Sequence, residues 1–150
     1  MDDHKFHEII DFAVEREKEA VAFYLQLQQM VKFDSRRELL KEFETMERHH
    51  IEILENLRHT NLNHISVPKV EDLKISNYVV ETKPDPEMSY QEIITTAMKR
   101  EEASYNLYTD LAKRSDDEEV GKIFRKLAGE EAKHKLHFEQ IYDQDILQEN

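Results

Sequence analysis

The sequence contains no cysteine and no tryptophan, and its 150 residues include only two glycines and three prolines. Because the sequence has no cysteine, it cannot form a disulfide, bind zinc through Cys or hold an iron–sulfur centre. Few Gly and Pro residues, together with abundant Ala, Glu, Lys, Leu and Arg, favour long helices over a β-sheet. We therefore expect an all-α protein.

Long apolar runs are also absent, and the first ten residues, MDDHKFHEII, lack the pattern of a signal peptide. We expect a cytoplasmic protein with no membrane partner. The formal net charge is −12 at pH 7, and because such a surface repels phosphate we expect no nucleic-acid partner. The length fits one domain, residues 1–150, that can bury its own core.

Four stretches have the spacing of three and four residues that places apolar side chains on one face of a helix. Ser35 with Glu38 has the spacing of a capping box at the start of the second helix. Ser89 with Glu92 has the same spacing at the start of the third, and residues 115–118 offer an N-cap for the fourth. The predicted helices span about residues 3–31, 35–58, 87–114 and 116–144.

The stretch from about 59 to 86 lacks helical periodicity and contains all three prolines. A helix of about 25 residues is roughly 37 Å long, and a connection of this length can span it. We therefore predict a four-helix bundle of two hairpins joined by a long crossover, as in ferritin-like folds. Residues 78–80 have a strand-like composition, and the polar chain after Tyr142 is expected to fray. The crossover residues expected to pack on the bundle are Ile65, Val67, Val70, Leu73, Ile75 and Tyr78.

Two Glu-x-x-His steps lie inside the predicted apolar stripes of the second and fourth helices. They are Glu47 to His50 and Glu131 to His134, and they stand 84 residues apart. Residues three apart share a helix face, so the Glu and the His of each step can reach one common point. A carboxylate in an apolar stripe is costly unless it is paired, which indicates a partner for these side chains.

The same offset of 84 residues carries Glu17 of the first helix onto Glu101 of the third without a gap. The two copies together supply four carboxylates and two imidazoles, the ligand set with which helix bundles hold two metal ions. We predict two Fe ions, with Mn or a mixed Fe/Mn pair as alternatives, because these ions bind carboxylate and imidazole well. The predicted metal ligands are Glu17, Glu47, His50, Glu101, Glu131 and His134.

The simplest distribution of these ligands uses two bridging carboxylates, because each carboxylate has two oxygens. A distribution crossed between the halves is the alternative. Such a metal pair with open positions can react with O2 or peroxide. In the simplest distribution Glu47 and Glu131 bridge, Glu17 and His50 complete one site, and Glu101 and His134 complete the other.

Tyr24 and Tyr108 occupy equivalent positions, seven residues after the two helical Glu ligands. Each phenol could hydrogen-bond a ligand carboxylate from a neighbouring helix and orient it, or it could be a plain core aromatic. A single Glu-x-x-His step is weak evidence of a metal site, but only two of the eight His have a Glu three residues before them. The groups expected at the surface or rim of the site, without a role as ligands, are Glu44, His49, Glu130 and His137.

The sequence resembles the rubrerythrin branch of the ferritin-like superfamily over about residues 4–145. The motif Glu-x-x-Ala-x-x-x-Tyr begins at Glu17, and a second copy begins at Glu101, with Ser104 in place of Ala. The crossover sequence 72–78 is similar to that of short rubrerythrin-like proteins. The resemblance implies a carboxylate-bridged di-iron centre that reacts with hydrogen peroxide, or with O2 during ferrous oxidation.

Two departures from this family matter. Many rubrerythrins carry a further Glu three residues after the third-helix ligand, where this chain has Ser104, which leaves a symmetric six-ligand set. These 150 residues contain no cysteine for a rubredoxin-type centre, so we expect the electron donor to be a separate protein of the rubredoxin type or a small molecule. We expect a peroxidase in oxidative-stress defence; the alternatives are a ferroxidase or iron-handling protein and a structural bundle with a vestigial site. A homodimer, with or without helix exchange, is expected.

Overall fold

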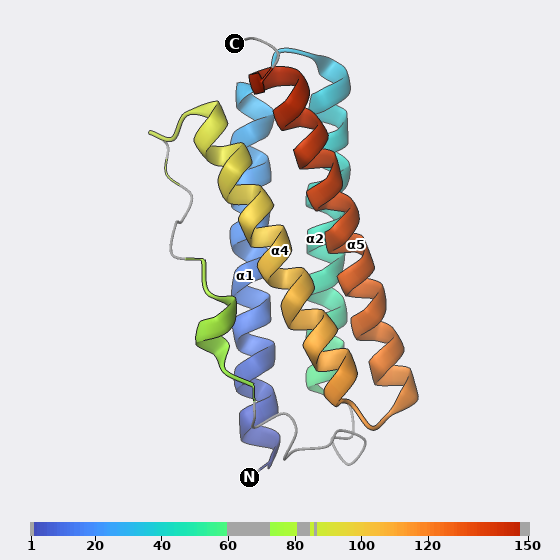
Figure 1. The fold of residues 1–150 in the computed structure, drawn as a ribbon. Helices are drawn as coiled ribbons and strands as arrows, with labels where there is room; N and C mark the ends of the chain where they lie inside the picture. The colour runs from blue at the N-terminus through green and yellow to red at the C-terminus, as the bar shows by residue number, and fades with distance from the viewer. Residues whose placement is uncertain (1, 60–72, 81–84, 86, 148–150) are drawn as a thin grey trace.

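The structure is a computed structural model in which residues 2–59, 73–80, 85 and 87–147 are described. Four long helices account for most of these residues (Figure 1), and two short helical turns accompany them. No β-strand occurs in the described ranges. The helices are α1 (Asp2–Met30), α2 (Asp34–Arg58), α4 (Tyr90–Arg114) and α5 (Glu118–Tyr142), and the turns are η2 (Ile75–Tyr78) and η3 (Asp143–Leu147).

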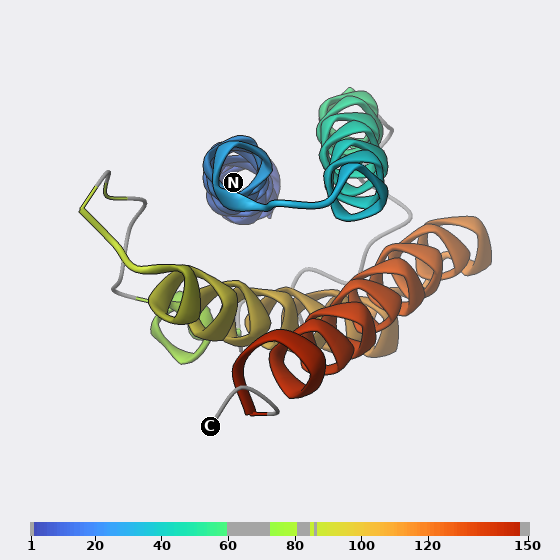
Figure 2. The same cartoon turned by 90° about the horizontal axis from the view of Figure 1, so that it is seen from above.

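The helices form two antiparallel hairpins, α1 with α2 and α4 with α5, which stack as two layers when viewed along the bundle (Figure 2). Helix α1 packs against α4 between the layers. Helix α2 ends at the opposite end of the bundle from the start of α4 (Figure 1), so the connection between them must cover the full length of the bundle. The all-α prediction and the four-helix bundle with a long crossover are confirmed.

The apolar core is divided into two parts along the bundle axis. One cluster lies toward the α2 C-terminus and includes Phe6, Leu54 and Phe124. The other lies toward the α1–α2 turn and includes Leu27 and Phe138. Each long helix contributes residues to both clusters, and buried polar residues lie between its two contributions. A buried polar layer therefore crosses the middle of the bundle.

Two of the predicted helix starts are confirmed and one is wrong. Ser89 caps α4, since its Oγ accepts the Glu92 amide at 3.1 Å and Glu92 accepts the Ser89 amide at 3.3 Å. Asp117 caps α5. Ser35 does not cap α2, because that helix already begins at Asp34 and its N-cap residue, Phe33, offers no side-chain hydrogen bond.

Residues 143–147 do not fray, contrary to expectation. Residues 143–147 form the π-helical turn η3, in which Ile146 is buried. Asp145 holds this turn in place, because it accepts hydrogen bonds from Arg36 at 2.7 Å and from Tyr90 at 2.6 Å. The polar residues that suggested fraying are thus the ones that dock the turn.

The crossover is described only in part. Leu73 and Tyr78 are buried against the first core cluster, as predicted. The strand-like composition of residues 78–80 was misleading, because Tyr78 ends a 3-10 turn and the two valines after it join no sheet among the described residues. The expectations for Ile65, Val67 and Val70 lie outside the described residues, as does that for the Ile75 side chain. None of the described helices has the length and apolarity needed to cross a membrane.

The capping box at α4 gives a test of the helix assignments. Replacing Ser89 by Ala removes one hydrogen bond to the first turn, which should lower the free energy of unfolding by about 1 kcal/mol. In a chain of this length that corresponds to a fall in Tm of roughly 2–4 °C in thermal denaturation. Ser35→Ala is the matched control and should leave Tm unchanged. Equal losses for both variants would contradict the assignment of the helix starts.

Candidate metal centre

All six predicted ligands come together in the polar layer between the two core clusters. Each helix contributes, and the position of each side chain follows from the spacing of three within α2 and α5. None of the six side chains is more than 4% exposed. The residues are Glu17 on α1, Glu47 and His50 on α2, Glu101 on α4, and Glu131 and His134 on α5.

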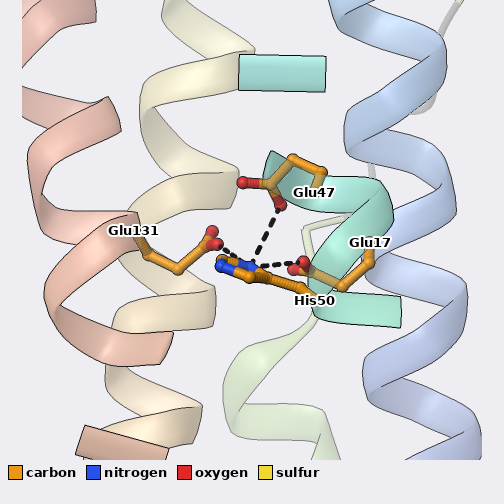
Figure 3. A group of neighbouring side chains, drawn as sticks. All are labelled: Glu17, Glu47, His50 and Glu131. Atoms are coloured by element: carbon orange, nitrogen blue, oxygen red, sulfur yellow. Dashed lines mark hydrogen bonds and ion pairs between the residues drawn. The ribbon is translucent and has the colours of Figure 1, made fainter. Parts of the chain in front are cut away.

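His50 lies at the centre of one group of donors, shown in Figure 3. Its Nδ1 is 2.9 Å from Oε2 of Glu17 and 2.8 Å from Oε1 of Glu131. Oε2 of Glu47 is 3.9 Å from the same nitrogen. One imidazole nitrogen therefore faces carboxylates from α1, α2 and α5 at once.

His134 occupies the equivalent place in a second group. Its Nδ1 is 2.9 Å from Oε1 of Glu47 and 3.7 Å from Oε1 of Glu101. Within each group, one donor atom from every member lies within 4.8 Å of the others, and the two groups share Glu47 and Glu131. Two neighbouring four-residue groups with two common carboxylates are the arrangement that a pair of bridged metal ions requires.

Several polar atoms of this cluster have no hydrogen-bond partner. Buried atoms of this kind are rare in proteins, and an unpaired buried carboxylate is costly. No Lys or Arg among the described residues forms an ion pair with any of the four carboxylates. A divalent cation bound between these atoms would satisfy all of them, so the donor set fits a metal pair. The atoms without a hydrogen bond of good geometry are Glu17 Oε1, both carboxylate oxygens of Glu47, Glu101 Oε2, Glu131 Oε1 and His134 Nδ1. Three of them, Glu47 Oε1, Glu131 Oε1 and His134 Nδ1, lie 2.8 or 2.9 Å from another side-chain atom of the cluster but at angles that do not suit a hydrogen bond.

The protonation of the cluster reflects the same burial. Loss of solvent raises the pKa of Glu101 and of Glu131 to about 8, and in Glu131 the nearby charge of Glu101 adds to this effect. Burial and the charge of Glu131 also raise the pKa of Glu17, and burial raises that of Glu47 well above its usual range. Without a cation the carboxyl groups therefore resist ionisation at neutral pH.

The two histidines are affected in opposite directions. Burial acts to lower the pKa of His50, but its hydrogen bonds to Glu131 and Glu17 outweigh that effect and raise it to about 11. Burial dominates at His134 and lowers its pKa. The two halves of the cluster are thus alike in ligand type but different in surroundings.

Glu130 is a contact of the site that the sequence analysis missed. It was expected at the surface or rim of the site, and its side chain, 17% exposed, does lie at the rim, but its Oε1 also lies 3.1 Å from Nε2 of His50. Its carboxylate approaches from α5, 80 positions along the chain, and no spacing rule links residues so far apart. The available signal was its position directly before Glu131, which turns its side chain toward the edge of the same layer.

Tyr24 and Tyr108 are both buried beside the cluster but differ in their contacts. The Tyr108 hydroxyl lies within hydrogen-bonding reach of Glu17, and burial together with this carboxylate raises the pKa of the phenol. The Tyr24 ring stacks on Phe138 at 5.5 Å between centroids and meets the His134 ring edge-on at 6.3 Å. The contact with Glu17 supports a role for Tyr108 in orienting a ligand carboxylate, whereas the ring contacts of Tyr24 are those of a core aromatic.

A small cavity reaches the cluster from the face between α1 and α4. Its volume of about 10 Å³ is the room that about one water molecule needs, and it touches Glu101, Glu131 and Ser104. Arg16 and Arg100 also line this cavity, and both form ion pairs with Glu19, at 2.6 Å and 2.9 Å respectively. A water molecule can therefore lie beside two of the carboxylates on this side.

The raised pKa values predict how the metal-free protein responds to pH. In the unfolded chain Glu101 and Glu131 lose their protons near pH 4.5, whereas in the folded chain they keep them up to about pH 8. The folded state binds more protons between these values, so the free energy of unfolding falls as pH rises. The raised pKa of His50 acts in the same direction above about pH 6.5.

Thermal denaturation of the metal-free protein should show this directly. A loss of only about 2 kcal/mol between about pH 5 and about pH 8 would lower Tm by roughly 4–8 °C. With Fe(II) or Mn(II) bound to the ionised carboxylates, Tm should be higher at the upper pH and the decline should disappear. A metal-free Tm that stays constant or rises over this range would contradict the assigned protonation.

Comparison with known proteins gives three findings. No curated protein matches the sequence. A solved structure of a hypothetical protein from Pyrococcus furiosus is similar, with a TM-score of 0.70 and 21% identity over 92% of this chain and 88% of that chain, and it shows the fold alone. The sequence model of the rubrerythrin family matches residues 8–142. This chain therefore belongs to the rubrerythrin family.

Proposed function

We propose that this protein holds two iron ions in the buried layer and uses them to reduce hydrogen peroxide, as a peroxidase in oxidative-stress defence. The observation that carries this proposal is the pair of four-residue groups that share Glu47 and Glu131. Family membership supports the same chemistry. Manganese or a mixed pair would suit the same oxygen and nitrogen donors.

The charge of the site supports a pair of divalent ions. Four carboxylates carry four negative charges and two divalent ions carry four positive ones, so the loaded layer is neutral with neutral imidazoles. The desolvation that raises the carboxyl pKa values would then be offset by direct bonds to the ions. Glu17 with His50 would complete one metal site, and Glu101 with His134 the other.

Bound in this layer, two redox-active ions would supply one electron each to an oxidant. The protein's own contribution is to position the ligand side chains and to enclose the site. The apolar clusters on both sides limit the entry of water along the bundle axis. Tyr108 would hold Glu17 through its hydroxyl, and the water-sized cavity beside Ser104 marks the side from which a small oxidant would approach Glu101 and Glu131.

Ser104 has a further consequence for this reaction. The resemblance places an additional Glu at this position in many rubrerythrins, and a serine hydroxyl cannot replace a charged bidentate ligand. We propose that the six ligands stay in place through the reaction. The electron donor would be a separate protein of the rubredoxin type or a small reductant. The cytoplasmic location and the homodimer are part of the same proposal.

Metal content is the first test. Wild-type protein grown with iron should contain two irons per chain by mass spectrometry. Glu47→Gln keeps the size of the side chain but removes a shared ligand, so it should bind less than one iron per chain. Glu44→Gln is the matched control, because Glu44 lies one turn earlier on α2 and bonds to Gln28 and Arg48 instead. Equal occupancy in both variants would contradict the ligand assignment.

Stopped-flow mixing of the reduced, iron-loaded protein then separates the candidate functions. Oxidation by peroxide at least about tenfold faster than by O2, with turnover when a reductant is supplied, is expected of a peroxidase. Faster oxidation by O2 with uptake of excess Fe(II) would favour an iron-handling protein instead. A wild-type chain that binds no metal would leave only a structural bundle.

A further inference from the structure

We propose that Glu130 is a positioning residue that makes the two metal sites unequal, so that the His50 site binds its metal first and more tightly. The inference rests on the proposed function, because it assumes that the buried cluster binds two metals. It goes beyond that function by assigning a role to a side chain outside the six ligands and an order to metal loading.

The contact between Glu130 and His50 fixes which ring nitrogen can serve as a ligand. The carboxylate of Glu130 accepts the Nε2–H of His50 at 3.1 Å. With a metal bound to the ring, the proton would stay on Nε2, and Nδ1, which lies beside oxygens of Glu17 and Glu131, would be the nitrogen free to bind the metal. A carboxylate on the remote nitrogen of a ligating imidazole also raises the basicity of the nitrogen that binds the metal.

The internal repeat shows that the other half lacks this contact. The offset of 84 residues that carries His50 onto His134 carries Met46 onto Glu130. Met46 and His134 line the same cleft between α2 and α5. A thioether is only a weak hydrogen-bond acceptor, and among the described residues no side chain forms a hydrogen bond with Nε2 of His134. Glu130 lines the same cleft but forms its hydrogen bond with His50.

His134 is positioned by packing instead. Its ring stacks on Phe43 with centroids 4.1 Å apart and an angle of 30° between the planes. The repeat equivalent of Phe43 is Leu127, so His50 has no comparable ring partner. Packing fixes the plane of an imidazole but does not choose its tautomer or increase its basicity. The two sites therefore share their ligand types and differ in what supports the histidine.

The consequence is stepwise metal binding. Loss of a carboxylate partner on a ligating histidine typically weakens metal affinity by about 10–100-fold. The His50 site should be tighter than the His134 site by a factor in that range. A first metal would bind at His50 with Glu17 and the shared carboxylates, and the second would complete the pair at His134.

Titration of the metal-free protein with Co(II) tests this without redox chemistry, because the absorption of bound Co(II) reports each binding step. Wild type should show two steps that differ about 10–100-fold in affinity. Glu130→Ala should weaken the first step until the two coincide, and Glu130→Gln, which keeps an oxygen acceptor without charge, should fall between. Met46→Glu should tighten the second step by giving His134 a carboxylate.

Glu42→Ala is the matched control. Glu42 is a carboxylate lining the same cleft. Among the described residues it forms neither a hydrogen bond nor an ion pair with His50. It should leave both binding steps unchanged. Circular dichroism of each variant checks that the helices are intact.

A second readout reports the tautomer. In Zn(II)-loaded protein labelled with 15N-histidine, the NMR signal of Nε2–H of His50 should be protected from exchange with water in wild type and in Glu130→Gln. The protection should be lost in Glu130→Ala, and Glu42→Ala should keep it.

Three results would overturn the inference. Two equal Co(II) sites in wild type would contradict it while leaving the proposed function intact. The same would hold if Glu130→Ala and Glu42→Ala gave identical two-step titrations. A wild-type chain that takes up no Co(II) would overturn the proposed function and this inference together.

Discussion

The cost of burying four carboxylates and two imidazoles in the middle of an apolar core is the constraint on which the rest of this structure depends. The six side chains are almost completely removed from solvent, and several of their polar atoms meet no partner within the protein. Hydrophobic burial in the clusters on either side holds the helices together and thereby holds the carboxylates near one another. Only bound protons or cations can offset the cost of keeping these carboxylates buried and close together.

Protons and metal ions thus compete for the same oxygens. At neutral pH the raised pKa values of Glu101 and Glu131 keep the metal-free layer partly protonated. Metal binding must displace those protons, and this couples affinity for the metal to pH and to the stability of the fold. On the proposal that this layer binds metal, the bundle is organised for a loaded centre. The four-helix topology brings one Glu or one Glu-x-x-His step from each helix into one layer.

Most of the fold and of the candidate site could be predicted from the sequence, because the patterns that specify them are local and occur twice in the chain. Apolar spacing located the helices, and the offset of 84 residues linked Glu17 to Glu101 and His50 to His134 across the chain. Ser89 was recognisable as a cap because its partner is three residues away. Ser35 has the same spacing but fails as a cap because α2 begins one residue before it.

The features that escaped prediction depend on contacts between distant segments. The π-helical turn after Tyr142 forms because Arg36 and Tyr90 bind Asp145, and neither residue is near it in sequence. Glu130 meets His50 across the interface of two helices, which no periodicity within one helix can reveal. The inequality of the two halves likewise emerges only when the repeat and the contacts are considered together.

The measurement that tests the central claim most directly is anomalous X-ray diffraction at the iron absorption edge from crystals of the iron-loaded protein. The account predicts two anomalous peaks about 3.5–4 Å apart in the layer between the core clusters, each within bonding distance of Glu47 and Glu131. A single peak, or peaks at the protein surface with the buried cluster empty, would contradict it.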